Sequence, residues 1–266
     1  MSAGDTMGSE GKEKELARPS VVISQPMYFP WPGLLEQIKL CDIFVDYNDV
    51  QFSKGSLFNR VQIKTEHGTR WLTVPLKNVR LGQLIRETEI DQSKNWQQAH
   101  MDQLNHAYGK ALFRRDVIDL VTGVFDARAH YLGELAFASM NALLNYFPAI
   151  KANRNFVDSS NLNIDGASTQ RVIDICAAVQ GRSYVTGHGA RHYLDHEAFE
   201  RQGIAVEYID YGLQSYRQLH GAFTPYISTL DLIANCGIDG SNYIGGTTVP
   251  WREFLVRFEC AKTESV

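Results

Sequence analysis

The chain has 266 residues, 44% of them hydrophobic and 21% charged, which is typical of an ordered globular protein and excludes disorder as its main state. Its 26 lysines and arginines are outnumbered by 30 aspartates and glutamates, so the net charge of −4 does not favour nucleic acid or an anionic membrane. No apolar stretch reaches the roughly 20 residues of a membrane-spanning helix, and the N-terminus lacks the hydrophobic region of a signal peptide. We expect a cytoplasmic protein with no nucleic-acid partner and no membrane insertion.

Cysteine usage agrees with this expectation. Cys41, Cys176, Cys236 and Cys260 are widely spaced and form no Cys-x-x-Cys pair, which indicates reduced and mostly buried thiols. Cys236 stands in an Asn-Cys-Gly sequence near an expected helix end, and a catalytic role for it is the less favoured alternative.

The N-terminal part of the chain predicts a tail followed by a βαβ unit. Residues 1–18 hold almost no large apolar side chains, and we expect a disordered tail there. A buried strand at 20–25 leads into a Pro-rich loop, a short helix at 34–40 and a second buried strand at 42–47. A strand, a helix and a strand within about thirty residues predict an α/β fold with a parallel-sheet core.

The remaining elements follow from changes in hydrophobic period. Alternation at 58–76 around Glu66-His-Gly68 predicts an inserted β-hairpin, and helical spacing predicts a helical subdomain at about 95–150. Further elements are a helix at 168–179, strands at 183–186 and 204–209, and a short helix at 228–235. Since no linker or repeat follows residue 18, we expect a single α/β domain over 19–266.

The first candidate site is the loop Gln25-Pro-Met-Tyr-Phe-Pro-Trp-Pro-Gly33, directly after the first strand. In α/β folds, ligands bind at the carboxyl ends of the strands, and the N-terminus of the next helix offers backbone N–H groups to an anion. Prolines restrict the loop before any ligand binds, and Gln25 supplies both a donor and an acceptor. We assign Gln25, Tyr28 and Phe29 to substrate binding; the alternative is a Pro-rich turn that only joins strand to helix.

A second cluster follows the second strand. The ends of the two strands share one edge of a parallel sheet, so the carboxylates and amides after residue 46 are expected near Gln25. A self-paired charged surface is the less favoured alternative. We assign Asp49 the role of catalytic general base, and assign Gln51, Lys54, Asn59, Arg60 and Lys64 to substrate binding.

The third cluster follows the strand at 183–186. Its two glycines permit a tight turn whose backbone N–H groups can hold a phosphate or carboxylate, and His188 is the second catalytic candidate because imidazole exchanges protons near neutral pH. Three histidines here at i, i+4 and i+8 have metal-ligand spacing, but without a His-Glu-x-x-His pattern we predict no metal site. The substrate-binding residues assigned here are Gly187, Gly189, Arg191 and Tyr193.

These motifs together resemble the WbqC-like protein family over about residues 20–237. The resemblance rests on Gln25-Pro-Met-Tyr-Phe-Pro-Trp-Pro-Gly33, Asp49-Val-Gln-Phe-Ser-Lys54, Asn59-Arg60, Trp71-Leu-Thr-Val-Pro75, Tyr193-Leu194, Ser228-Thr-Leu-Asp231 and Asn235-Cys-Gly237. It implies a place in the biosynthesis of bacterial O-antigen or another surface polysaccharide, which is a pathway rather than a single reaction.

The first strand, loop and second strand also resemble, more distantly, the opening of pantothenate synthetase and other nucleotidyltransferase-like enzymes. Those enzymes bind ATP through a His-x-Gly-His turn, whose place is taken here by Trp31-Pro-Gly-Leu34. Both histidines that would stabilise the transferring phosphate are missing, so the resemblance implies the fold and not the ATP chemistry.

The leading hypothesis is a transferase that moves an acyl or aminoacyl group onto the amine of a nucleotide-linked or carrier-linked sugar, which would be its small-molecule partner. The first alternative is a non-catalytic protein that binds a sugar nucleotide or a carrier. The second is an ATP-dependent amide ligase that acts through an acyl-adenylate. The sequence names no cofactor and does not indicate the oligomeric state.

Overall fold

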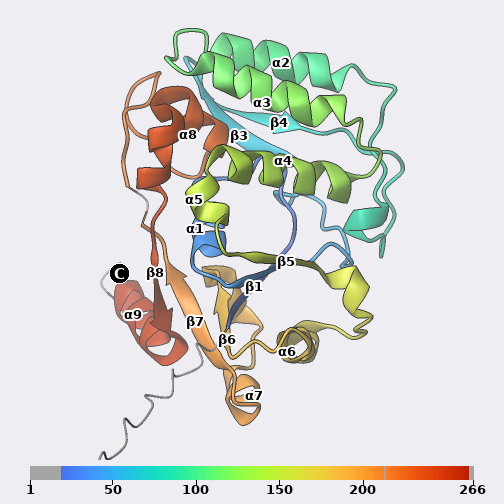
Figure 1. The fold of residues 1–266 in the computed structure, drawn as a ribbon, viewed down its shortest axis with the longest axis vertical. Coiled ribbons are helices and arrows are strands. Elements are labelled where there is room, and N and C mark those ends of the chain that lie inside the picture. The colour runs from blue at the N-terminus through green and yellow to red at the C-terminus, as the bar shows by residue number, and fades with distance from the viewer. Residues whose placement is uncertain (1–18, 213, 264–266) are drawn as a thin grey trace, which may run out of the picture.

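The computed structural model describes residues 19–212 and 214–263 (Figure 1), and the tail expected at 1–18 lies outside them. Its centre is a six-stranded sheet with the strand order β5-β2-β1-β6-β7-β8. The strands are β1 (Ser20–Ser24), β2 (Ile43–Asp46), β5 (Asn155–Asp158), β6 (Ser183–Thr186), β7 (Ala205–Asp210) and β8 (Thr247–Pro250). All neighbours pair in parallel except β7 and β8, which are antiparallel, so the predicted α/β fold with a parallel core is confirmed.

The predicted βαβ unit is present, with α1 (Pro32–Lys39) between β1 and β2. Val21 pairs with Ile43 of β2 on one side and with Tyr184 of β6 on the other, so β1 lies inside the sheet. Val21 and Val22 are both buried, but they belong to different hydrophobic clusters. Both faces of β1 are therefore covered, as expected of a continuous apolar run in a parallel sheet.

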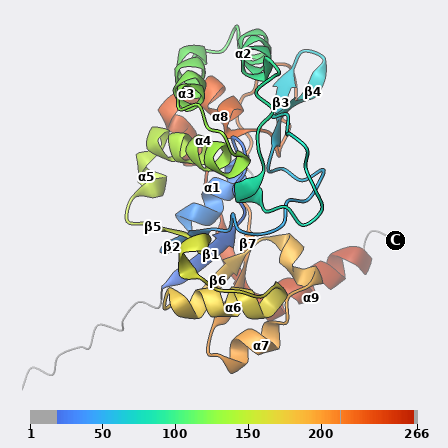
Figure 2. The same cartoon turned by 90° about the vertical axis from the view of Figure 1, so that its right-hand side faces the viewer.

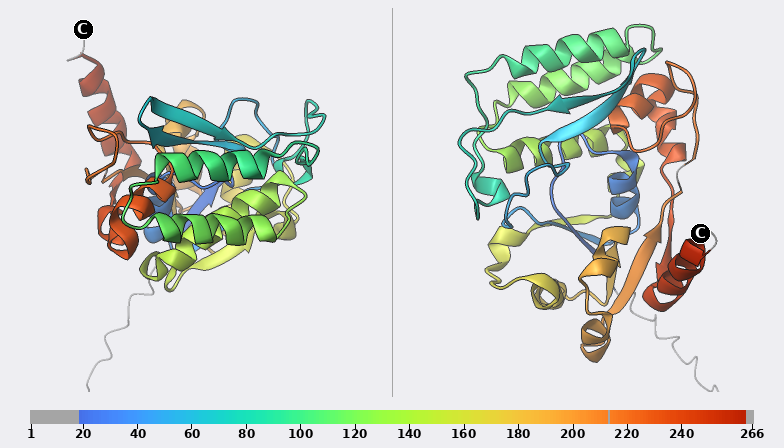
Figure 3. Two further views of the ribbon diagram at one scale, coloured as in Figure 1. Left: turned by 90° about the horizontal axis from the view of Figure 1, so that it is seen from above. Right: turned by 180° about the vertical axis from the view of Figure 1, so that it is seen from behind.

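One face of the sheet carries the inserted hairpin and most of the helices. The hairpin pairs β3 (Arg60–Thr65) with β4 (Gly68–Thr73) around the predicted turn, and Figure 3 shows it beside α2 and α8. The helices expected at 95–150 are observed, and they share one hydrophobic cluster with α1 and the sheet. The elements on this face are α2 (Trp96–Ala107), α3 (Arg114–Asp126), α4 (Leu132–Tyr146), α5 (Pro148–Lys151), α8 (Thr229–Cys236), η1 (Ile85–Glu87) and η4 (Gly237–Tyr243).

The opposite face is covered by helices from the C-terminal half (Figure 2). They are α6 (Ser168–Ala178), α7 (His196–Arg201) and α9 (Trp251–Thr263), with the short turns η2 (Ser159–Leu162) and η3 (His188–His192) between the strands. Tyr208 of β7 stacks on Phe254 of α9 with 4.1 Å between ring centroids, which fixes the last helix to the sheet. Among residues 19–212 and 214–263, no helix has the length and apolar character needed to cross a membrane.

Gly212, after β7, lies close to the backbone of Gly245, before β8, and also contacts α1. A Cβ added to Gly212 would lie 1.5 Å from the carbonyl oxygen of Gly245, so only glycine fits. The Gly212 amide donates to Oε2 of Glu36, a buried carboxylate of α1, at 3.0 Å. This contact aligns the C-terminal strands with the helix that follows β1.

We expect Gly212→Ala to lower the free energy of unfolding by about 2–3 kcal/mol, because the added methyl group must displace backbone. Urea denaturation would measure the change. Gly123→Ala is the matched control, since Gly123 lies in α3 with no atom within 4 Å of an added Cβ, and a helical alanine is favoured over glycine. Equal stability of Gly212→Ala and the wild type would contradict the close approach.

Candidate functional site

The chain reverses its direction across the sheet between β1 and β6. From β1 it moves to β2 and later to β5 on one side, whereas β6 and β7 extend the sheet on the other side. Such a switch point leaves a crevice outside the carboxyl ends of the two strands. A cavity of about 710 Å³ opens at this place, which is the position that the topology favours for a ligand.

The cavity brings together residues from all three sequence clusters. Its polar lining comes from the ends of β1, β2 and β6 and from the start of α6. The predicted residues that line it are Gln25, Asp49, Gln51, Gly187, Gly189 and Tyr193. The expected convergence of the clusters on one sheet edge is thus observed, while the binding roles of these residues stay predictions.

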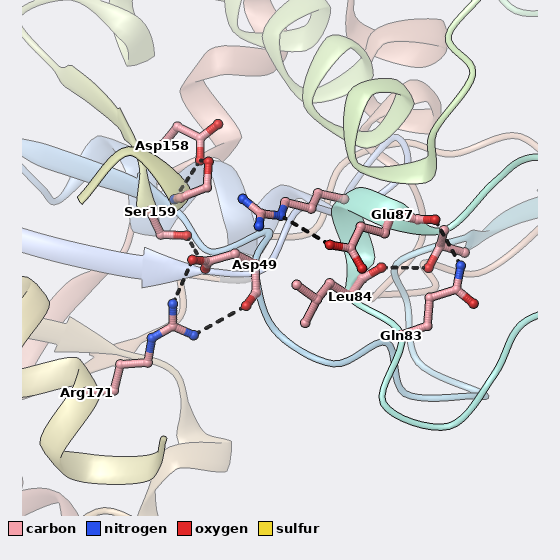
Figure 4. A network of polar contacts seen from close by, with 10 residues as sticks. Asp49, Gln83, Leu84, Glu87, Asp158, Ser159 and Arg171 are labelled. Carbon is pink, nitrogen blue, oxygen red and sulfur yellow. Dashed lines mark hydrogen bonds and ion pairs between the residues drawn. The ribbon is translucent and has the colours of Figure 1, made fainter. Parts of the chain in front are cut away.

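Asp49 is held by Ser159 and Arg171, which lie more than 100 residues later in the chain (Figure 4). Its Oδ2 accepts a hydrogen bond from Nη2 of Arg171 at 2.7 Å, and its Oδ1 accepts one from Oγ of Ser159 at 2.5 Å. Nη1 of Arg171 also donates to the Asp49 carbonyl oxygen at 3.3 Å. The side chains of Arg171 and Asp49 are only 8% and 12% exposed, so this ion pair clamps the loop after β2 to α6 and η2.

The N-terminus of α6 forms one wall of the cavity. Gly166, Ala167 and Ser168 line it, and the N-cap residue Ala167 has no side chain that accepts from the first turn. The first backbone N–H groups of this 11-residue helix therefore lack a capping partner from the side chain. Together with the helix dipole, they make this wall attractive to an anion.

Aromatic hydroxyl groups complete the wall. The guanidinium of Arg171 lies over the ring of Tyr47, 5.0 Å from its centroid. Burial raises the pKa of Tyr47, an effect that Arg171 partly offsets, and burial also raises the pKa of Tyr193. Both phenols are consequently neutral hydrogen-bond donors near pH 7.

Most of the Pro-rich loop lies outside the cavity. Tyr28 and Phe29 are fully buried, and the Tyr28 hydroxyl is 3.0 Å from Nδ1 of His100. Ser228 Oγ donates to the Phe29 carbonyl at 2.8 Å, and the Trp31 ring packs over Gly33 at the start of α1. The loop therefore anchors α2 and α8 to the core, and of its residues Gln25 lines the cavity.

Four other residues of the second cluster also lie away from the cavity. Lys64 is buried and donates to Gln218 Oε1 at 3.1 Å, and the guanidinium of Arg60 lies over the Trp71 ring, 4.4 Å from its centroid. Asn59 donates to the Val74 carbonyl at 2.9 Å. Lys54 is exposed and outside the lining of the cavity. Arg60 and Asn59 stabilise the hairpin and the strand exit beside it, and Lys64 joins the hairpin to the segment before α8, so the structure does not bring these four residues to the cavity.

His188 and Arg191 lie behind the glycine turn. Nε2 of His188 lies 2.8 Å from the carbonyl oxygen of Ile209 and donates a hydrogen bond to it, and the ring packs against Phe254 and Tyr211. Arg191 donates to the His188 carbonyl and lies over the Phe258 ring. Neither side chain lines the cavity.

Sequence reasoning missed Arg171, Ser159 and the start of α6. An arginine on a helix is normally solvated, and only the tertiary structure brings Asp49 against Arg171. The sequence Gly-Ala-Ser at 166–168 does signal a helix start, but the sequence does not show what that helix faces. Within the part of the chain that the structure describes, no three histidine, cysteine or acidic residues are grouped to hold a metal ion.

The cysteines behave as packing residues. Cys41 and Cys176 are buried, Cys236 is half-buried and Cys260 is exposed. Burial raises the pKa of Cys41 and Cys176 to about 12, and it also raises the pKa of Cys236. A raised pKa disfavours the thiolate that a nucleophilic Cys236 would need.

Comparison with known proteins assigns the family. The model of the WbqC-like protein family matches residues 25–243, which include every residue that lines the cavity except Ile23 and Ser24. The chain belongs to the WbqC-like family. A relative in Mycobacterium tuberculosis (strain ATCC 25618 / H37Rv), the uncharacterized protein Rv1507c, is 33% identical over 227 residues, covering 84% of this chain and 96% of the relative. No solved structure matches, and the likeness to pantothenate synthetase is not shown.

We expect Arg171→Met in this WbqC-like chain to lower the free energy of unfolding by about 3 kcal/mol, because it leaves the Asp49 carboxylate buried without its cation. The double variant Asp49→Leu/Arg171→Met should regain most of that loss, and chemical denaturation of both variants would show it. Arg115→Met is the control: its ion pair with Asp119 is exposed, so the change should stay below about 0.5 kcal/mol. A double variant no more stable than Arg171→Met would contradict the clamp.

Proposed function

We propose that this WbqC-like protein binds a nucleotide-linked or carrier-linked sugar in the cavity at the β1–β6 switch point and transfers an acyl or aminoacyl group to the sugar amine. The observation that carries the proposal is the uncapped N-terminus of α6, which faces a cavity whose charged lining side chains, Asp49 and Arg171, are paired with each other. A phosphate group would accept hydrogen bonds from these N–H groups. The resemblance of the motifs to the WbqC-like family supports a substrate from O-antigen or other surface-polysaccharide biosynthesis.

The lining offers contacts for the remainder of such a ligand. Gln25 and Gln51 present amides from the ends of β1 and β2, and sugar hydroxyl groups pair with amides as both donors and acceptors. Gly187 and Gly189 allow close approach of the backbone beside the α6 wall. Tyr193, with 57% of its surface exposed, offers a ring face on which a sugar or base can stack.

Asp49 is the proposed general base for the amine. Of the described residues that line the cavity, it alone carries a carboxylate. To accept a proton, one of its oxygens must exchange the hydrogen bond from Ser159 or Arg171 for the substrate amine. His188 would have to act through Nδ1, since its Nε2 is engaged by the Ile209 carbonyl.

The engagement of both base candidates favours a second function. A protein that binds and delivers a sugar nucleotide or a carrier-linked intermediate needs the anion wall but no base. In that case the Asp49–Arg171 pair serves to hold the cavity open, as the clamp geometry suggests. Product analysis after binding separates the two functions, because only the transferase converts its ligand.

The binding part is tested by a thermal-shift panel of sugar nucleotides, ATP, coenzyme A thioesters and amino acids. A ligand at 100 times its Kd adds about 2.7 kcal/mol of stability, which raises Tm by several degrees in a chain of this length. We expect a shift with an amino-sugar nucleotide that Gln25→Ala reduces. A shift with ATP alone would support the amide-ligase alternative instead.

The catalytic part is tested by turnover of the ligand that binds. We expect Asp49→Asn to lower turnover about 100-fold if Asp49 is the base, and His188→Ala to do so if His188 is. Ser159→Ala is the matched control, because it removes one hydrogen bond to Asp49 and keeps the carboxylate. Wild-type rates in both test variants would remove both residues as bases, and the absence of any product would favour the delivery function.

A further inference from the structure

A second cavity, of about 450 Å³, lies on the other face of the same sheet edge, between the ends of β2 and β5 and the start of α4. It shares no lining residue with the first cavity, so the following inference does not rest on the proposed transferase. Its lining residues are Asp46, Asn48, Arg86, Gly133, Glu134, Phe137, Phe156, Val157, Asp158, Ser160 and Asn161. The alternation of β2 explains the separation, since Asp46 and Tyr47 point to opposite faces.

Two buried oxygen atoms in this cavity lack a hydrogen-bond partner. They are Oδ1 of Asp46 and Oδ1 of Asn48, in residues that are only 5% and 8% exposed. Nδ2 of Asn48 donates to the other carboxylate oxygen of Asp46 at 3.0 Å, so the free atom of the Asn48 amide is its acceptor. Buried acceptors without a donor are costly, and a donor brought by a ligand would relieve that cost.

The charges around these atoms favour a cation. Asp46, Glu134 and Asp158 supply three carboxylates, and Arg86 is the one cationic side chain among the described residues of the lining. Nε of Arg86 lies 3.9 Å from Oε1 of Glu87, and the Arg86 side chain is 45% exposed. Burial, with smaller contributions from the charges of Asp158 and Asp49, raises the pKa of Asp46 to about 7, and the hydrogen bond from Asn48 offsets part of the rise.

The lining of this cavity suits an ammonium group better than a metal ion. The described residues hold no group of three or more histidine, cysteine or acidic side chains arranged for a metal. Glu134 is already engaged, because its Oε2 accepts the backbone N–H groups of His130 and Tyr131, and Asp158 Oδ1 accepts from Ser160. A primary ammonium has three N–H donors in a compact head. Two of them can donate to the free oxygens of Asp46 and Asn48, and the third can donate to solvent.

We propose that the cavity between β2, β5 and α4 binds the primary ammonium group of a small polar molecule such as an amino sugar, with Asp46 and Asn48 accepting its hydrogen bonds. The volume suits a monosaccharide, and the rings of Phe137 and Phe156 offer apolar surface for the carbon skeleton. The positive charge of Arg86 in the same lining repels the ammonium group, so it weakens binding.

Saturation-transfer NMR at pH 7 tests this site with glucosamine and with glucose, which lacks the ammonium. We expect glucosamine to bind the wild-type chain, glucose to bind at least tenfold more weakly, and Asp46→Asn to weaken glucosamine at least tenfold. Arg86→Gln should strengthen glucosamine binding, a gain that a purely structural residue would not give. Asp119→Asn, which removes an exposed carboxylate from α3, is the control and should leave binding unchanged.

Equal binding of glucose and glucosamine, or unchanged binding in Asp46→Asn, would overturn the proposal, and so would the absence of glucosamine binding. If Asp46→Asn does not fold, Asn48→Ala provides the same test through the second acceptor. Gln25→Ala distinguishes the two cavities, because it should reduce sugar-nucleotide binding at the first and leave glucosamine at the second unaffected. Loss of both in that variant would assign glucosamine to the first cavity and would also overturn the proposal.

Discussion

Burial of β1 on both faces, with a parallel neighbour on each side, is the constraint on which the remaining structure depends. Val21 and Val22 pack into two different clusters, so helices must cover both faces of the sheet. Close approach of β6 to β1 requires Gly181, since a Cβ there would lie 2.3 Å from the Val21 side chain. The same arrangement places the topological switch, and with it the larger cavity, at the carboxyl ends of these strands.

Charge is distributed differently over the two faces of that edge. On one face Asp49 is neutralised by Arg171, which leaves the helix N-terminus of α6 as the dominant local field. On the other face Asp46 has no cation bound to it, and burial keeps the pKa of this carboxyl near 7. Asp46, the last residue of β2, and Asp49, in the loop that follows, therefore line different cavities although only two residues separate them in the sequence.

The sequence indicated which residues lie close together where they follow the ends of strands, while their roles stay predictions. Gln25, Asp49 and Gly187 share the cavity because strand ends in a parallel sheet lie at one edge, and strand ends are legible in the hydrophobic pattern. The sequence did not indicate this for the hairpin, where Lys64 binds Gln218, 154 residues away, and Arg60 packs on Trp71 of the paired strand. Composition of the Pro-rich loop suggested a binding surface, but Tyr28 and Phe29 are large apolar rings and the core accommodates them.

By itself, the sequence determined the α/β class, the βαβ unit, the hairpin, the helical region and the family, because these depend on local periodicity and on motifs. Only the tertiary structure decided the order of the strands, the pairing of Asp49 with Arg171 122 residues away, and the burial of Asp46 without a cation. Those features depend on contacts between residues far apart in the chain. Local pattern carries no information about which buried partner a charged side chain meets.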